Sequence, residues 1–400
     1  MGFEKKYERN IILIFLIFFL YAFAMSWNVI QVLYFQDLGL NFSQISFILL
    51  IISLTVLVFE IPTGIFTDFY GRKRSILIFA GFLTLVSILI TLSVNFYFIC
   101  FVVFLLGIAF SFASGTISAL LFESLKKVGR EKKFKKYLAK SQFIFIVVGV
   151  LTNYFVPIYF NINIFYPFYF ACVSSMLLFG VGLFLFEDKR EKSDVLEKLK
   201  GGLVENINRQ FKVSVRIIKD DYDIVWIILF SAVFGLTIGV FGDLINQPII
   251  KKFYDFSEYG LIFACATVVQ SFLLFYINGI IKYFERFNEF LVLVIGWSIS
   301  LILLVLFIKN IYLVILISGI MWMFGTLRGI LVINELNQRI SDDSKRATIL
   351  SSNSMVSSLV LVVCLPIFGF FMDFVSLESV IYFMGGFAFV SGLILILFKI

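Results

Sequence analysis

Residues 43–94 decide the fold class, and they read SQISFILLIISLTVLVFEIPTGIFTDFYGRKRSILIFAGFLTLVSILITLSV. Two apolar runs, 43–68 and 75–94, flank a short turn that carries Arg72, Lys73 and Arg74. A helix needs about 20 apolar residues to cross the hydrocarbon core of a bilayer. Both runs are continuous, whereas the strands of a membrane barrel alternate apolar and polar residues. The stretch therefore predicts two membrane-spanning helices joined by a basic turn.

The remainder of the chain repeats this pattern. Apolar residues make up 61% of the 400 positions and charged residues 15%, whereas soluble domains average about 45–50% and about 25%. The first apolar run is too long for the apolar part of a cleaved signal peptide and leads directly into further runs. We predict an all-α membrane protein with twelve spans, at 11–33, 43–68, 75–94, 97–123, 139–160, 164–186, 223–248, 257–282, 287–308, 311–337, 347–373 and 376–398.

The basic residues predict the topology. Of the 33 Lys and Arg residues, 29 fall on one side of the predicted membrane, three fall on the other (Lys251, Lys252 and Lys309) and Arg328 lies within a span. Cytoplasmic loops carry an excess of positive charge, so both termini are predicted to be cytoplasmic, in a plasma-membrane protein. This distribution explains the net charge of +7 without a nucleic-acid partner, which would need a basic patch on one folded face.

The longest polar interval, 187–222, divides the chain into two predicted six-helix bundles, 1–186 and 223–400. The interval itself is predicted to be a cytoplasmic linker. A helix lying on the inner membrane surface is one interpretation of the apolar residues that recur within it at helical spacing, and a solvated charged linker is the other. Those apolar residues are Val204, Ile207, Phe211, Val215 and Ile218.

A faint internal repeat relates the two bundles. Related halves around a site at the membrane midplane are the architecture of many secondary transporters. The repeat is carried by pairs of residues that lie 210 positions apart, namely Gly115 and Gly325, Lys136 and Arg346, and Ser141 and Ser351.

The basic turn belongs to a longer motif, Gly64-Ile65-Phe66-Thr67-Asp68-Phe69-Tyr70-Gly71-Arg72-Lys73-Arg74. It resembles the signature of the Major Facilitator Superfamily between its second and third helices, G-x-x-x-D-x-x-G-R-[KR]-[KR], at every fixed position. Gly64 permits close helix approach, Gly71 a tight turn, and Asp68 offers a carboxylate to a helix N-terminus. The alternative is an ordinary basic loop after a helix-terminal aspartate.

This resemblance extends over nearly the whole chain. Glu60–Gly64 and the stretch Arg346–Ser351 at the start of span 347–373 are also similar to members of the superfamily. The resemblance implies a cytoplasmic gate built from Gly64, Asp68, Gly71, Arg72, Lys73 and Arg346. The antiporter signature of many drug exporters, G-x-x-x-G-P-x-x-G-G, is absent, because residues 149–154 lack its second glycine and its proline.

Polar residues inside the spans predict a central cavity. Buried amides and charges are costly in lipid, so they face a bundle interior or water. The third, sixth, ninth and twelfth spans have none over residues 75–94, 164–186, 290–308 and 379–398, and are predicted to be peripheral. Arg328 is expected to pair with Glu335, with binding of an anionic substrate as the alternative. The candidate coupling or cavity residues are Glu60, Asn28, Gln31, Glu123, Asn153, Asp243, Arg328 and Glu335.

Several residue types and motifs that other function classes require are absent from the sequence. The chain has no histidine, no paired CxxC cysteines and no nucleotide-binding G-x-x-x-x-G-K-[ST] loop, so we expect no metal, no cofactor and no ATP-driven transport. Any coupling to protons must use a carboxylate, and Glu60 and Asp243 are the candidates. We expect a monomeric, proton-coupled exporter of amphipathic small molecules. Uptake of a nutrient or metabolite is the first alternative, and a membrane-embedded lipid-modifying enzyme is the second.

Overall fold

The computed structural model describes residues 3–92, 94–188, 222–277, 279, 282, 288–339 and 343–397. Every regular element in this part of the chain is a helix, and eleven helical stretches are long and apolar enough to cross a membrane. A twelfth, α4 (Arg72–Leu89), starts with the three basic residues of the motif. The predicted all-α fold with twelve spans is confirmed. The predicted surface helix at 204–218 lies outside the described residues.

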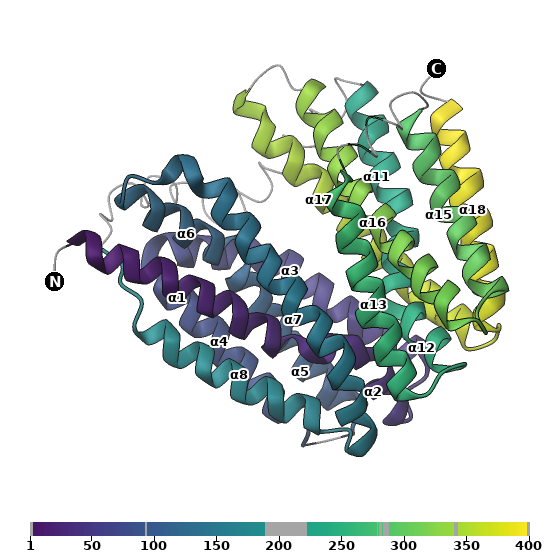
Figure 1. Ribbon diagram of the computed structural model, residues 1–400, viewed down its shortest axis with the longest axis horizontal. Coiled ribbons are helices and arrows are strands. Elements are labelled where there is room, and N and C mark those ends of the chain that lie inside the picture. The colour runs from purple at the N-terminus through teal and green to yellow at the C-terminus, as the bar shows by residue number, and fades with distance from the viewer. Residues whose placement is uncertain are drawn as a thin grey trace. The chain divides into compact units, whose positions relative to one another are not determined.

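Figure 1 shows the helices as two bundles, coloured purple to teal and green to yellow. The first half contains α1 (Phe3–Ala24), η1 (Ser26–Ile30), α2 (Gln31–Asp37), α3 (Phe42–Tyr70), α4, α5 (Phe96–Ala113), α6 (Thr116–Lys127), η2 (Glu131–Lys133), α7 (Phe134–Ile162) and α8 (Tyr166–Leu183). The second half contains α11 (Tyr222–Val240), η3 (Phe241–Ile245), α12 (Asn246–Lys251), α13 (Phe256–Phe275), α15 (Glu289–Leu306), α16 (Ile311–Arg339), α17 (Asp343–Met372) and α18 (Leu377–Leu397).

Three spans are interrupted at points that the apolar pattern did not reveal. The first span changes from α-helix to a 3₁₀ turn at η1, and the seventh contains a π-helical turn at η3. The fourth breaks between α5 and α6 at Gly115, whose φ of 68° is left-handed. Short 3₁₀ and π segments inside long helices often mark functional positions.

Contacts between Cα atoms divide the chain into two compact units, Met1–Gln31 with Ile51–Asn206, and Val32–Leu50 with Ile207–Ile400. Within the first, α4 packs along α8, and within the second, α15 packs along α18. These four helices are the spans predicted to be peripheral. Residues 32–50 group with the second unit, although they lie within the first six-helix stretch of the chain.

The start of α3 is held inside the second unit by the end of α17. The Asp373 carboxylate accepts the backbone N–H groups of Phe42 at 2.8 Å and Ser43 at 3.1 Å, together with the Ser43 hydroxyl. One turn earlier, Gly369 lies so close to α3 that a Cβ atom would meet Ser46 Oγ and the Phe42 carbonyl oxygen. A carboxylate at a helix N-terminus is stabilised by the free N–H groups and the helix dipole.

Candidate functional site

The first unit contains a polar cavity of about 320 Å³ beside the break in the first span. Asn28 of η1 and Asn153 of α7 contribute two side-chain amides, and Ser26 contributes a hydroxyl. The Ser26 side chain is 4% exposed, and its Oγ has no hydrogen-bond partner among the described residues. The remaining lining residues are Tyr21, Ala22, Met25, Val29, Phe110, Phe145, Gly149 and Thr152.

A second cavity of about 360 Å³ shares Tyr21, Phe110 and Phe145 with the first. Its polar lining consists of Gln142 and the hydroxyls of Ser114 and Ser118 near the α5–α6 break, and its other lining residues are Phe18, Ala113 and Ile117. No side chain that lines either cavity in the described part of the chain is an acid or a base. The two cavities therefore offer amides, hydroxyls and aromatic rings to an uncharged ligand.

The backbone at the first break explains why these polar groups face the cavity. After α1 ends, the 3₁₀ turn Ser26–Ile30 changes the rotation of side chains about the helix axis. Asn28 stays exposed while Trp27 is buried against Phe168, with ring centroids 5.4 Å apart. Trp27 is consequently a packing residue, and Asn28 is the polar group presented by this turn.

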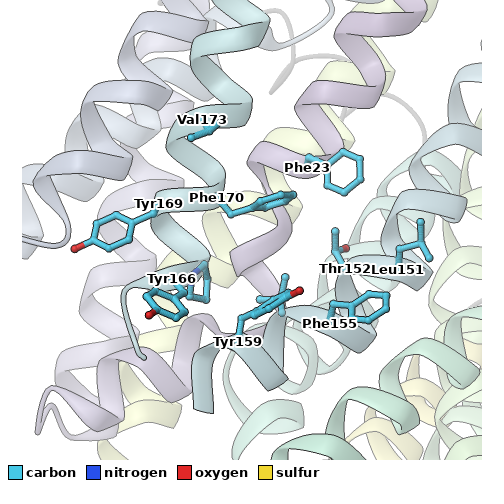
Figure 2. Close-up of a pocket in the computed structure, with 11 residues that line it drawn as sticks. Phe23, Leu151, Thr152, Phe155, Tyr159, Tyr166, Tyr169, Phe170 and Val173 are labelled. Carbon is cyan, nitrogen blue, oxygen red and sulfur yellow. The ribbon is translucent and has the colours of Figure 1, made fainter. Parts of the chain in front are cut away.

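An apolar groove of about 590 Å³ lies on the other side of α7, between α7, α8 and Phe23 of α1. Figure 2 shows the rings of Phe23, Phe155, Tyr159 and Phe170 around it. Thr152 lines both this groove and the amide-containing cavity. The other lining residues are Leu151, Val156, Tyr166, Pro167, Tyr169 and Val173.

In the second unit, Asp243 lies at the middle of the π-helical turn η3. Its side chain is exposed and makes no hydrogen bond to any described residue. The neighbouring Gly242 packs against the Trp322 ring, which a Cβ atom would approach to 3.1 Å. Asn246 and Gln247 are buried just beyond the turn, and Gln247 Oε1 accepts the backbone N–H of Val32 at 2.8 Å. Asp243 is thus an accessible carboxylate in a span that is otherwise well buried.

The first span of each half contains a five-residue break, the 3₁₀ turn Ser26–Ile30 in the first half and the π-helical turn Phe241–Ile245 in the second. The middle residue is Asn28 in the first turn and Asp243 in the second. One break therefore carries an amide and the other an acid.

Arg328 does not make the pairing that the sequence suggested. Its guanidinium donates from Nη1 to the backbone carbonyl of Ser231 at 2.8 Å, and it fills the space beside Gly235. Glu335 instead accepts a hydrogen bond from Arg339 Nε at 3.3 Å, one turn along α16. The expected Arg328–Glu335 pair is wrong, because the arginine reaches across to α11 rather than along its own helix.

The predicted gate motif is held by a residue that the sequence analysis did not identify, Glu187. Its carboxylate accepts the backbone N–H groups of Arg72 at 2.9 Å and Lys73 at 2.8 Å, at the N-terminus of α4. Gly71 precedes them with φ of 96°, and a Cβ there would lie 2.6 Å from Glu187 Oε2. Glycine is therefore required at this turn for both conformation and space.

The side chains of the motif make further contacts within the first unit. Arg72 Nη2 forms an ion pair with Glu123 Oε1 of α6 at 2.9 Å, and Lys73 Nζ donates to the Leu183 carbonyl at 2.7 Å. Glu123 therefore joins the motif rather than the cavities described above. No sequence spacing links residues 72, 123 and 187, which explains why Glu187 was not foreseen.

The remaining predicted site residues do not line the cavities. Glu60, Gly64 and Asp68 follow one another every four residues on an exposed face of α3, and a Cβ at Gly64 would meet nothing within 4 Å. Gln31 is half-buried at the start of α2. Arg346 lies in the first turns of α17, and its side chain is outside the described part of the structure. Of the predicted cavity residues, the structure brings together Asn28 and Asn153.

A family model, a sequence relative and solved structures are similar to this chain. Residues 12–257 match the model of the Major Facilitator Superfamily. A relative from Bacillus subtilis (strain 168), the uncharacterised MFS-type transporter YxaM, is 28% identical over 153 residues, which are 38% of this chain and 37% of that protein. Among solved structures, the nucleoside transporter NupG has a TM-score of 0.75 at 14% identity, covering 99% of this chain and 98% of its own. A D-xylose–proton symporter has a TM-score of 0.67 at 12% identity, covering 96% of each chain.

Proposed function

Because the chain belongs to the Major Facilitator Superfamily, it is a multi-pass membrane transporter rather than an enzyme, and we propose that it moves a small uncharged amphipathic compound by proton-coupled alternating access. The proposal includes two six-helix domains, 1–186 and 223–400, joined by the linker 187–222. It also includes cytoplasmic termini, a plasma-membrane location and a monomeric state.

The observation that carries the substrate class is the uncharged polar lining of the first unit. Ser26, Asn28 and Asn153 offer donors and acceptors, and the Ser26 hydroxyl is buried without a described partner. A buried polar group costs free energy unless it is hydrogen-bonded. A ligand with a neutral hydrogen-bonding group would satisfy it, whereas a charged ligand would meet no opposite charge there.

Asp243 is the proposed proton carrier. A carboxylate in a membrane span is expensive while it is charged, and protonation removes that cost. No hydrogen bond or ion pair joins it to another side chain in the described part of the chain, so within that part its charge is not compensated. Glu60 is the weaker candidate, because it lies on an exposed face of α3 away from the cavities.

Export is the proposed direction, because the cavities are rich in aromatic rings and poor in charge, as suits compounds that enter cells through lipid. Uptake of a metabolite is the second candidate, favoured by the absence of the antiporter signature in residues 149–154. Export and uptake are distinguished by measuring substrate transport under a pH gradient in liposomes that hold the protein in one orientation or the other.

The test begins with a thermal-stability screen of uncharged amphiphiles on the purified protein, since a ligand of the native state raises Tm. The best compound is then followed in liposomes under an imposed pH gradient, with proton movement recorded by an internal dye. The wild type should accumulate the compound against its gradient and move protons with it. Asp243→Asn should bind the compound but only exchange it, and Glu60→Gln should still accumulate it. Accumulation by Asp243→Asn would contradict the proposed coupling.

A further inference from the structure

The groove beside α7 opens at the surface of the first unit. The side chains of Leu151, Phe155, Phe170 and Val173, which line it, are each 46–56% exposed, in helices that are long and apolar enough to cross a membrane. A compound dissolved among acyl chains would reach a groove on such a surface without passing through water.

Aromatic rings make up most of the groove wall. Six of its eleven lining residues are Phe or Tyr, and Phe23 and Phe170 already meet edge to face at 5.4 Å between centroids. Aromatic rings attract further rings in offset or edge-to-face geometry by about 0.5–1.5 kcal/mol beyond the burial of area. This wall favours a ligand that contains an aromatic ring over a saturated acyl chain.

One side chain lines both the groove and the amide-containing cavity. Thr152 lines both spaces, and its hydroxyl donates to the Gly149 carbonyl at 3.2 Å one turn earlier. At Gly149, which lines the cavity, a Cβ would meet nothing within 4 Å. The polarity changes at this point, from rings on one side of α7 to the amides of Asn28 and Asn153 on the other.

We infer that the groove is a lateral entrance for the substrate, which is an uncharged compound with aromatic rings and one hydrogen-bonding group. Its rings lie against Phe23, Phe155 and Phe170, and its polar group passes Thr152 to reach the cavity of Ser26 and Asn28. This inference rests on the proposed transport function and adds to it both the route from the membrane and the ring-containing substrate class.

The probe for the test is tritiated diphenylamine, which has two rings, no charge and a single N–H donor. Binding is measured on the purified full chain in lipid nanodiscs, with subtraction of empty nanodiscs and competition by unlabelled compound. The wild type should show a saturable component. Val173→Trp fills the groove and should weaken this component by about tenfold or more. Met176→Trp is the matched control, since Met176 is equally exposed on α8 but does not line the groove, and it should bind like the wild type.

A second pair of variants tests the link to the cavity. In the proposed route a single diphenylamine molecule occupies both the groove and the cavity. Asn28→Leu should therefore weaken its binding, because the N–H group of the ligand loses the Asn28 amide. No saturable binding to the wild type, or equal binding by Val173→Trp and Met176→Trp, would mean that the groove holds ordinary bilayer lipid only. Unchanged binding by Asn28→Leu would overturn the connection between the two spaces. Asp243→Asn should bind normally, so a failure of the proposed proton coupling is seen separately in the transport assay.

Discussion

The two halves of the chain place different chemistry at the break in their first span. The break in the first span presents Asn28 to a cavity without charged side chains, and the break in the seventh presents the carboxylate of Asp243. An amide side chain stays neutral at every pH, whereas a carboxylate loses its charge when it binds a proton. In the proposed function, one half recognises an uncharged compound at its break and the other responds to protons.

The same difference, amides in the first half and acids in the second, occurs at the start of α3 and at the start of α13. Before α3, Asn41 and Gln44 exchange hydrogen bonds between side chain and backbone, at 2.9 and 3.1 Å. Before α13, Asp255 and Glu258 form the corresponding capping box. Both arrangements satisfy free N–H groups at a helix start, so the geometry is kept while the charge differs.

The largest effect on uphill transport is expected when the residues at the two helix breaks are exchanged. Asp243→Asn should abolish uphill transport, because no protonatable group remains at either break. Adding Asn28→Asp should not restore it, and it should weaken substrate binding by placing a charge in the uncharged cavity. The measurement is substrate accumulation and dye-reported proton flux in liposomes. Restored uphill transport in the double variant would show that the two breaks are interchangeable.

A smaller effect is expected at the gate motif of the first half. We predict that Asp68 binds a helix N-terminus in one transport state, where a carboxylate gains about 0.3–1 kcal/mol, or about 2 kcal/mol when partly buried. Losing that contact shifts a two-state balance by up to about thirtyfold. Asp68→Asn should slow turnover with little change in substrate affinity and raise cytoplasmic labelling of cavity cysteines.

Glu60→Gln is the control for this variant, since it lies two turns away on the same exposed face of α3. Its turnover should remain close to that of the wild type. Unchanged turnover and unchanged cysteine labelling in Asp68→Asn would show that this contact does not exist.

The third prediction concerns stability in the first half alone. Gly71→Ala forces a side chain into a left-handed conformation and into the Glu187 carboxylate, and it should lower the free energy of unfolding by about 1–3 kcal/mol. Gly64→Ala is the control, because Gly64 is helical and has open space for a Cβ. Thermal unfolding in detergent should show a clear fall in Tm for the first variant. A similar Tm for both would contradict the packing described here.

The smallest effect should distinguish the two capping arrangements by pH. The Glu258 backbone N–H and the Ser257 side chain hold the pKa of the Asp255 carboxyl below its ordinary value. A lowered pKa stabilises the fold above the ordinary pKa of about 4, and this gain disappears as the pH falls through the folded pKa. Asp255→Asn should lower Tm slightly at neutral pH and by less in acid. Asn41→Asp should show the opposite sign, with any gain confined to neutral pH.

The sequence predicts the spans because apolar length and the distribution of basic residues are local properties. It predicts Gly71 and Asn28 as special positions for the same reason, since a turn and an amide inside an apolar run can be recognised along the chain. It does not predict that Glu187 caps α4 or that Ser26 and Thr152 line cavities, because those contacts depend on helix packing. Arg328 shows the limit most clearly: the nearest acid along its helix is Glu335, but its partner is the Ser231 carbonyl on another helix.

The cap that Asp373 forms on α3 affects how the chain can be divided into two fragments. Helix α3 is continuous over 29 residues, yet its first nine residues group with the second unit and the others with the first. A polypeptide cut in the linker would therefore yield a first fragment that carries a piece of the second unit's fold. Two such fragments made separately are each incomplete, and co-expression gives each the surface that it lacks. The chain thus passes between the two units three times, after Gln31, after Leu50 within α3, and after Asn206.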